Sequence, residues 1–156
     1  YQEVTGVQTC ALPISVFWFW PNVDAGSDGT SNGIRTFREM VKPKSIHFFK
    51  NMEPLDFLRL LKHSRALIGN SSAGIRECSY LGLPVVNIGN RQNRRLRGKN
   101  VRDVSPQRDE IYDAVKELIN YNKFSGSQIY GNGEAGKKIA EILASSELSF
   151  SKTINY

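Results

Sequence analysis

Hydrophobic residues along the chain gather in short runs that alternate with segments of helical spacing. Five runs are rich in β-branched and aromatic residues and are typical of strands: 16–20 (VFWFW), 46–49 (IHFF), 66–69 (ALIG), 85–88 (VVNI) and 100–104 (NVRDV). Between most of them, apolar residues recur at every third or fourth position, as on a helix with one buried face. Strands that alternate with helices in this way indicate βαβ units and a parallel sheet.

The helical segments carry recognisable starts and stops. Pro54 suits the first turn of a helix whose apolar residues are Leu55, Leu58 and Leu61. A helix beginning near the serines at 71 and 72 is expected to run until Gly82 ends it before the strand at 85–88. The other apolar positions at helical spacing are Ile34, Phe37, Val41, Ile111, Ala114, Val115, Leu118, Ile119, Ile139, Ala140, Ile142 and Leu143.

The two ends of the chain are treated separately from this pattern. Residues 4–14, VTGVQTCALPI, resemble the translation of a common sequencing adapter joined to a reading frame, so residues 1–14 are expected not to be native. Residues 146–156 show little periodicity and are expected to form a frayed tail. One domain is therefore expected over 15–145, and the chain is interpreted as a fragment.

Cysteine usage and hydropathy bear on the compartment. Cys10 lies in the adapter-like stretch, which leaves Cys78 alone and excludes a disulfide framework. The apolar stretch ALPISVFWFW lacks a basic leader and is too short to span a bilayer. A cytoplasmic protein without a membrane partner is the expectation.

The formal net charge of +6 owes much to one segment, 91–99 (RQNRRLRGK). A solvated loop is the preferred interpretation of its arginines at 94, 95 and 97, although extra phosphate contacts are an alternative. Nucleic-acid binding is disfavoured, because the segment has no aromatic residues for stacking on bases and no groove-binding helix pattern.

The segment 68–77, IGNSSAGIRE, passes from a predicted strand into a predicted helix. In a parallel α/β sheet such a turn lies at the edge where ligands collect, with backbone N–H groups and the positive end of the helix nearby. Ser71 and Ser72 can cap the helix and donate hydroxyls outward, and Gly74 leaves room for a ligand. An anion fits there, although attraction to the helix end alone would contribute only about 0.3–2 kcal/mol.

Glu77 is not placed as a capping acid, because a capping box would put the acid three residues after the serine. On a helix its side chain would lean back over Ala73 and Gly74, near the anion. A phosphate would repel it, whereas a vicinal diol would donate to both its oxygens. Together the two features describe a nucleotide, with diphosphate at the serines and ribose at the acid. The alternative is that the serines merely cap and that Glu77 pairs with Arg76.

Other chemistry finds little support in the sequence. Neither a P-loop nor a G-x-G-x-x-G fingerprint is present, which disfavours kinases and dehydrogenases. His47 on a strand and His63 at a helix end are assigned structural roles, and Cys78 is expected to pack as a small buried side chain. No group of His, Cys or acidic residues has metal-ligand spacing, so neither a metal nor another cofactor is expected.

Four blocks carry a family resemblance: PNVDAGSDG (21–29), IGNSSAGIRE (68–77), LGLPVVNIGNRQ (81–92) and KNVRDV (99–104). In this order and spacing they resemble the C-terminal half of hydrolysing UDP-N-acetylglucosamine 2-epimerases, over roughly 15–143. The resemblance implies a Rossmann-like parallel sheet with flanking helices, one half of a glycosyltransferase-B-type two-domain fold. It also implies a UDP-sugar substrate, a separate N-terminal domain that supplies the catalytic groups, and a homo-oligomeric full-length protein.

The resemblance further implies a role for each site residue. Ser71 and Ser72 would hold the diphosphate, Glu77 the ribose hydroxyls, and Arg91 a phosphate or the adjacent strand-end loop. The nucleotide would also contact Asn22 and the backbone near Met52, with Phe57 packing near the uracil. No catalytic residue is expected in this chain, which should be inactive alone. The donor-binding half of a B-type glycosyltransferase is the main alternative, and a non-catalytic nucleic-acid-binding module is another.

Overall fold

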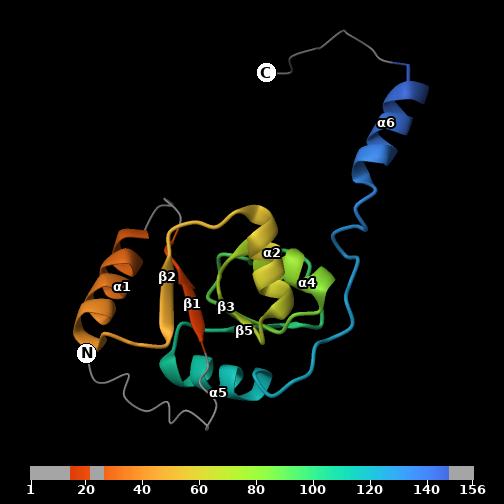
Figure 1. The fold of residues 1–156 in the computed structure, drawn as a ribbon. Coiled ribbons are helices and arrows are strands. Elements are labelled where there is room, and N and C mark those ends of the chain that lie inside the picture. The colour runs from red at the N-terminus through yellow and green to blue at the C-terminus, as the bar shows by residue number, and fades with distance from the viewer. Residues whose placement is uncertain (1–14, 22–26, 148–156) are drawn as a thin grey trace, which may run out of the picture. The chain divides into compact units, whose positions relative to one another are not determined.

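The computed structural model describes residues 15–21 and 27–147, which fall into two units divided after Phe57 (Figure 1). Each unit is described by itself. All five predicted strands are present, and every strand pair in the described residues is parallel. The strands form two sheets, of orders β1-β2 and β3-β4-β5, instead of one continuous sheet.

The first unit contains a βαβ arrangement. Its elements are β1 (Val16–Phe19), α1 (Ser27–Val41) and β2 (Ile46–Phe49). The indole of Trp18 lies 5.5 Å from the ring of Phe37 on α1 and 5.8 Å from that of Phe48 on β2, between ring centroids. Aromatic rings on neighbouring strands therefore pack against one another and against the helix.

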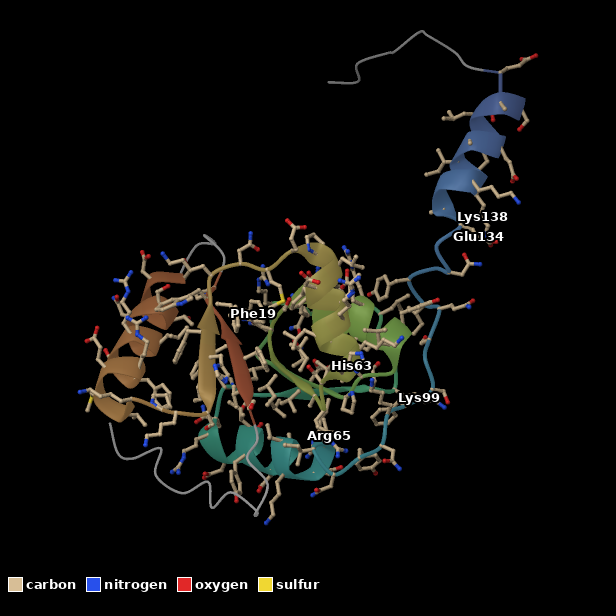
Figure 2. The ribbon with its side chains drawn as sticks, in the orientation of Figure 1. Phe19, His63, Arg65, Lys99, Glu134 and Lys138 are labelled. Atoms are coloured by element: carbon tan, nitrogen blue, oxygen red, sulfur yellow. The ribbon has the colours of Figure 1, made fainter. Side chains whose placement is uncertain are left out.

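Helix α2 (Pro54–His63) has proline in its first turn, where the missing N–H would have no partner within the helix. Leu61 is buried, whereas Leu55 and Leu58 are exposed. His63 is the last residue of α2, where the negative end of the helix dipole would stabilise a cationic side chain (Figure 2). The helical position expected for His63 is thus confirmed.

The second unit has a three-stranded sheet with helices on both faces. Its elements are β3 (Leu67–Gly69), α3 (Ser72–Ile75), α4 (Glu77–Leu81), β4 (Val85–Ile88), β5 (Val101–Val104), α5 (Arg108–Leu118) and α6 (Ala135–Ser145). At the carboxyl ends of the strands, Asn87 on the central strand lies between Gly69 and Asp103. This row of residues is the foundation of the candidate site.

Successive residues of β4 face opposite sides of the sheet. Val86 packs with Ala114 and Leu118 of α5 in one buried cluster. On the other face, a Cβ added at Gly74 would lie only 2.9 Å from Val85 Cγ1, so α3 approaches the sheet as closely as a glycine allows. Gly74 is buried and serves this packing. The expectation that its missing side chain makes room for a ligand is therefore wrong.

The helix expected from the serines to Gly82 is interrupted. α3 and α4 are separated by Arg76, whose backbone angles are φ −96° and ψ −73°. Gly74 lies inside this segment, and glycine costs about 1 kcal/mol of helix stability relative to alanine. Gly82 does end α4, in the left-handed conformation with φ 65°.

Helix α6 matches the predicted spacing, yet its apolar residues Ile139, Ile142 and Leu143 are more than half exposed. Across 15–21 and 27–147, no helix combines the length and the apolar character needed to cross a membrane.

Candidate functional site

The turn after β3 presents two serine side chains. Gly69 ends the strand with φ 141°, a backbone angle that favours glycine. Ser71 is the N-cap of α3, and its Oγ accepts a hydrogen bond of 3.3 Å from the N–H of Ala73. Ser71 is exposed and Ser72 half-buried, so neither residue is enclosed in the core. Both lie at the carboxyl edge of a parallel sheet, where ligands of such folds bind.

The helix that follows the serines contributes little charge to this turn. α3 has four residues, and the macrodipole of a helix needs several aligned peptide units. The expected attraction between an anion and the end of a long helix is therefore not available here. An anion bound at this turn would instead depend on hydroxyl groups and on a nearby cation.

Arg91 is a cationic side chain that contacts this turn. β4 ends at Ile88, and Gly89 turns the chain with φ 77° into the loop 89–99, called the basic loop below. Arg91 Nη1 donates a 3.2 Å hydrogen bond to the carbonyl oxygen of Asn70, the residue before Ser71. The guanidinium thus contacts the adjacent strand-end loop, which is one of the two roles implied for it.

Gln92 contacts the same carbonyl and was missed as a site residue by the sequence reasoning. Its Nε2 donates a 2.8 Å hydrogen bond to the oxygen of Asn70. The residue is only 2% exposed, and its Oε1 has no hydrogen-bond partner in the described part of the chain. Its role is identified by this contact with Asn70, 22 residues away in the sequence, and not by a local sequence pattern.

Glu77 lies at the start of α4, just after the break at Arg76. Its Oε1 is 2.9 Å from Arg76 Nη2, so the ion pair that was the alternative reading of this acid is present. Glu77 also lines a shallow surface depression of about 380 Å³ together with Arg76, Tyr80 and Tyr130. The carboxylate is therefore accessible, but a ligand at Glu77 would compete with Arg76.

Three predicted site residues are not among the described residues of the second unit. Met52 and Phe57 belong to the first unit, and Asn22 lies outside the described residues. The N–H of Met52 donates to Asn51 Oδ1 at 2.9 Å. Phe57 packs edge-on against Phe19, which Figure 2 labels, with 5.4 Å between ring centroids.

One arginine of the basic loop makes contacts that a solvated side chain would not make. Arg94 and Arg95 are exposed, as expected. The side chain of Arg97 is only 22% exposed and its Nε lies 2.6 Å from Asp103 Oδ2. For Arg97 the expectation of a solvated side chain is wrong, because an acid on β5 and backbone carbonyls of its own loop surround its guanidinium.

Cys78 is fully buried, which confirms its expected structural role. Burial raises the pKa of its thiol from 9.0 to about 12, and the charge of Glu77 adds to the shift. A thiol with this pKa stays protonated and is a poor nucleophile. Within residues 15–21 and 27–147, no three His, Cys, Asp or Glu residues come together in a group that could hold a metal ion.

Parallel strands with flanking helices, and polar side chains at the carboxyl edge of the sheet, define a Rossmann-like α/β protein. The family model for UDP-N-acetylglucosamine 2-epimerase matches residues 8–144, and the chain belongs to this family.

Two relatives show the extent of the similarity. The UDP-N-acetylglucosamine 2-epimerase of Neisseria meningitidis serogroup B is 30% identical over 138 residues, which are 85% of this chain and 35% of that protein. The hydrolysing UDP-N,N'-diacetylbacillosamine 2-epimerase of Legionella pneumophila is 32% identical over 133 residues, 85% of this chain and 34% of that protein. The chain spans about a third of the length of these relatives.

Among solved structures, the UDP-GlcNAc 2-epimerase of Methanocaldococcus jannaschii in complex with UDP-GlcNAc and UDP has a similar fold. The TM-score is 0.66 at 17% identity, over 85% of this chain and 36% of that one. The expected fold class, a Rossmann-like sheet with flanking helices as in one half of a glycosyltransferase-B-type fold, is confirmed.

Proposed function

We propose that this chain is the C-terminal, UDP-binding half of a hydrolysing UDP-N-acetylglucosamine 2-epimerase, which converts UDP-N-acetylglucosamine and water into N-acetylmannosamine and UDP. One observation carries the proposal. The exposed serine turn at the end of β3 and the guanidinium of Arg91 at the end of β4 meet at one peptide, because Arg91 donates to the carbonyl of Asn70. Hydroxyls beside a fixed cation form a site for a diphosphate.

Ser71 and Ser72 donate their hydroxyls to the diphosphate, and Arg91 adds a charged donor from the neighbouring loop. Glu77, which lies in a surface depression, accepts the two ribose hydroxyls once Arg76 moves aside. Asn22, Met52 and Phe57 are assigned to the nucleoside on the strength of the family resemblance. Membership of the epimerase family supports a UDP-sugar as the ligand.

The chemical task of these residues is to stabilise a leaving group. The proton at C2 of the sugar is removed, UDP departs from C1 to leave a 2-acetamidoglucal, and water adds across the double bond. Negative charge accumulates on the diphosphate as the C1–O bond breaks. Donors already fixed around that position stabilise the transition state without reorganising.

The proton-transfer groups are assigned to a preceding domain that this chain does not include. The chain spans about a third of its relatives, and no residue in it is proposed as a general acid or base. We therefore expect the chain alone to bind UDP without turning over UDP-N-acetylglucosamine.

Titration calorimetry with UDP tests the nucleotide site. Replacing both Ser71 and Ser72 by alanine should lower the affinity for UDP at least about tenfold, since hydrogen bonds to charged groups are worth about 1.5–3 kcal/mol. Ser145→Ala on α6 is the matched control, because its hydroxyl bonds within its own helix. Equal affinity of the double variant and the wild type would refute the diphosphate assignment.

The reaction itself is tested on a full-length protein that carries this segment. Release of UDP and free N-acetylmannosamine without any acceptor sugar is the expected result. UDP release that requires an acceptor sugar would identify the donor-binding half of a B-type glycosyltransferase instead. Parallel assays with a UDP-linked diacetylated deoxy sugar, the substrate type named for the Legionella relative, define the sugar.

A further inference from the structure

The basic loop and the serine turn are joined at a single acceptor. The carbonyl oxygen of Asn70 accepts hydrogen bonds from Arg91 Nη1 and Gln92 Nε2, across 21 and 22 residues of sequence. Asn70 directly precedes the N-cap Ser71, so the orientation of its peptide sets where the serine hydroxyls point. The loop therefore determines the geometry of the turn, provided that the loop itself is fixed.

Arg97 fixes the loop from within. Its Nη2 donates a 3.0 Å hydrogen bond to the carbonyl of Gln92, and its Nη1 donates a 2.6 Å bond to the carbonyl of Arg95. One side chain thus binds the backbone of the residue whose own side chain holds Asn70. Moving Arg97 would release Gln92 and, through it, the peptide before the serines.

The sheet anchors Arg97 in turn. Its Nε lies 2.6 Å from Asp103 Oδ2, while Asp103 Oδ1 accepts a 2.6 Å hydrogen bond from Asn87 Nδ2. Asn87 is 1% exposed on the central strand, where Gly69 is its partner on the other side. The contacts therefore form a closed circuit that starts in the sheet beside Gly69 and returns to Asn70.

We propose that Arg97 is a positioning residue for diphosphate binding, acting through Gln92 and Asn70 on the serine turn. The inference rests on the proposed function. The Arg97–Asp103 pair is partly exposed, with side chains 22% and 47% accessible, so it adds little to stability and its effect lies in geometry. The planar guanidinium donates to two backbone carbonyls and at the same time pairs with the carboxylate of Asp103, an arrangement that a lysine ammonium on its flexible stem does not reproduce.

The test compares UDP with uridine, which lacks the diphosphate, as ligands of the chain. Arg97→Lys keeps the charge and removes the planar fork, whereas Arg95→Met removes a charge from the same loop and keeps the contacts of Arg97. We expect Arg97→Lys to lower UDP affinity roughly tenfold and to leave uridine affinity within about twofold, whereas Arg95→Met changes UDP affinity by about twofold at most. UDP affinity unchanged in Arg97→Lys, or a parallel loss for uridine, would overturn the inference.

Amide hydrogen exchange provides a readout that needs no ligand. The N–H of Ala73 bonds to Ser71 Oγ, so a loosened turn should exchange this amide faster in Arg97→Lys but not in Arg95→Met. If the wild type fails to bind UDP, the proposed function is refuted while exchange still decides whether Arg97 orders the turn. If Arg97→Lys folds poorly, Asp103→Asn replaces it, because this variant removes the charge that pairs with Arg97 and keeps an acceptor for Asn87. Asp103→Asn should also exchange the Ala73 amide faster. Unchanged exchange of that amide would refute the positioning role of Arg97.

Discussion

Replacing Glu77 by alanine tests the ribose assignment most directly. Without a ligand the carboxylate of Glu77 pairs with Arg76. The side chain of Arg76 is 54% exposed and that of Glu77 is 30% exposed, so the pair is worth at most about 1 kcal/mol. Two hydroxyls donating to this carboxylate contribute about 1.5–3 kcal/mol net. The difference leaves a loss of about 0.5–3 kcal/mol on removal of Glu77, a roughly two- to 150-fold weaker affinity for UDP.

The assay is titration calorimetry with UDP and 2′-deoxyuridine diphosphate. The deoxy ligand should bind the wild type poorly and bind Glu77→Ala no worse, because the variant has lost the acceptor that distinguishes the two ligands. Arg76→Ala supplies the matched control at the neighbouring position. Arg76→Ala removes the side chain that competes with the ribose for Glu77, so this variant should bind UDP up to about fivefold more tightly.

Two results would refute this reasoning. UDP affinity that is unchanged in Glu77→Ala would show that the acid does not contact the ribose. Equal affinity of the wild type for UDP and 2′-deoxyuridine diphosphate would show that no group in the protein forms a hydrogen bond with the 2′-hydroxyl. In either case Glu77 would be a surface acid whose role is its ion pair with Arg76.

The remaining predictions concern the interior of the second unit. In a Cys10→Ser background, iodoacetamide should leave Cys78 unmodified until the chain unfolds, and rapid labelling of the folded chain would contradict its burial. The pKa of this thiol is raised from 9.0 to about 12. The contribution of the protonated thiol to the free energy of unfolding is therefore complete below pH 9.0 and is lost as the pH rises toward 12. In urea unfolding over that window, the free energy of unfolding of the wild type should fall by up to about 1.4 kcal/mol per pH unit more than that of Cys78→Ala. Gly82→Ala should lower the free energy of unfolding by more than about 2 kcal/mol, since its Cβ would lie 1.9 Å from the carbonyl oxygen of Phe124 at φ 65°, whereas Gly33→Ala in α1 should be neutral or stabilising.

The elements were predictable because they depend on local patterns. The run VVNI is β4 as expected, residue for residue, and the run NVRDV differs from β5 by one residue at its start. Gly82 ended a helix because the left-handed conformation favours glycine. These features need only the residues within one turn or one strand, so a single sequence contains them.

Features that depend on distant contacts were not predictable. The division into two sheets is set by which strands pair, and the break at Arg76 accompanies the close packing of Gly74 on Val85. The same holds for the site. The serines were identified from their position after a strand, whereas the role of Gln92 depends on a contact with Asn70 across 22 residues. No local pattern distinguishes Gln92 from a solvated glutamine.

The interrupted helix changes the physical basis of the proposed anion binding. A long helix would have offered a diphosphate its positive end, but the four residues of α3 do not. The fold instead fixes the orientation of the serine turn. Gly74 allows α3 to pack closely on the sheet, and Arg91 and Gln92 donate hydrogen bonds to the carbonyl of Asn70, just before α3. Groups that are already oriented lose little entropy when a ligand binds, so the two hydroxyls and the guanidinium of the proposed site would bind with a smaller ordering cost than flexible side chains. The affinity for UDP should therefore depend more on the order of the turn than on the net charge of the basic loop.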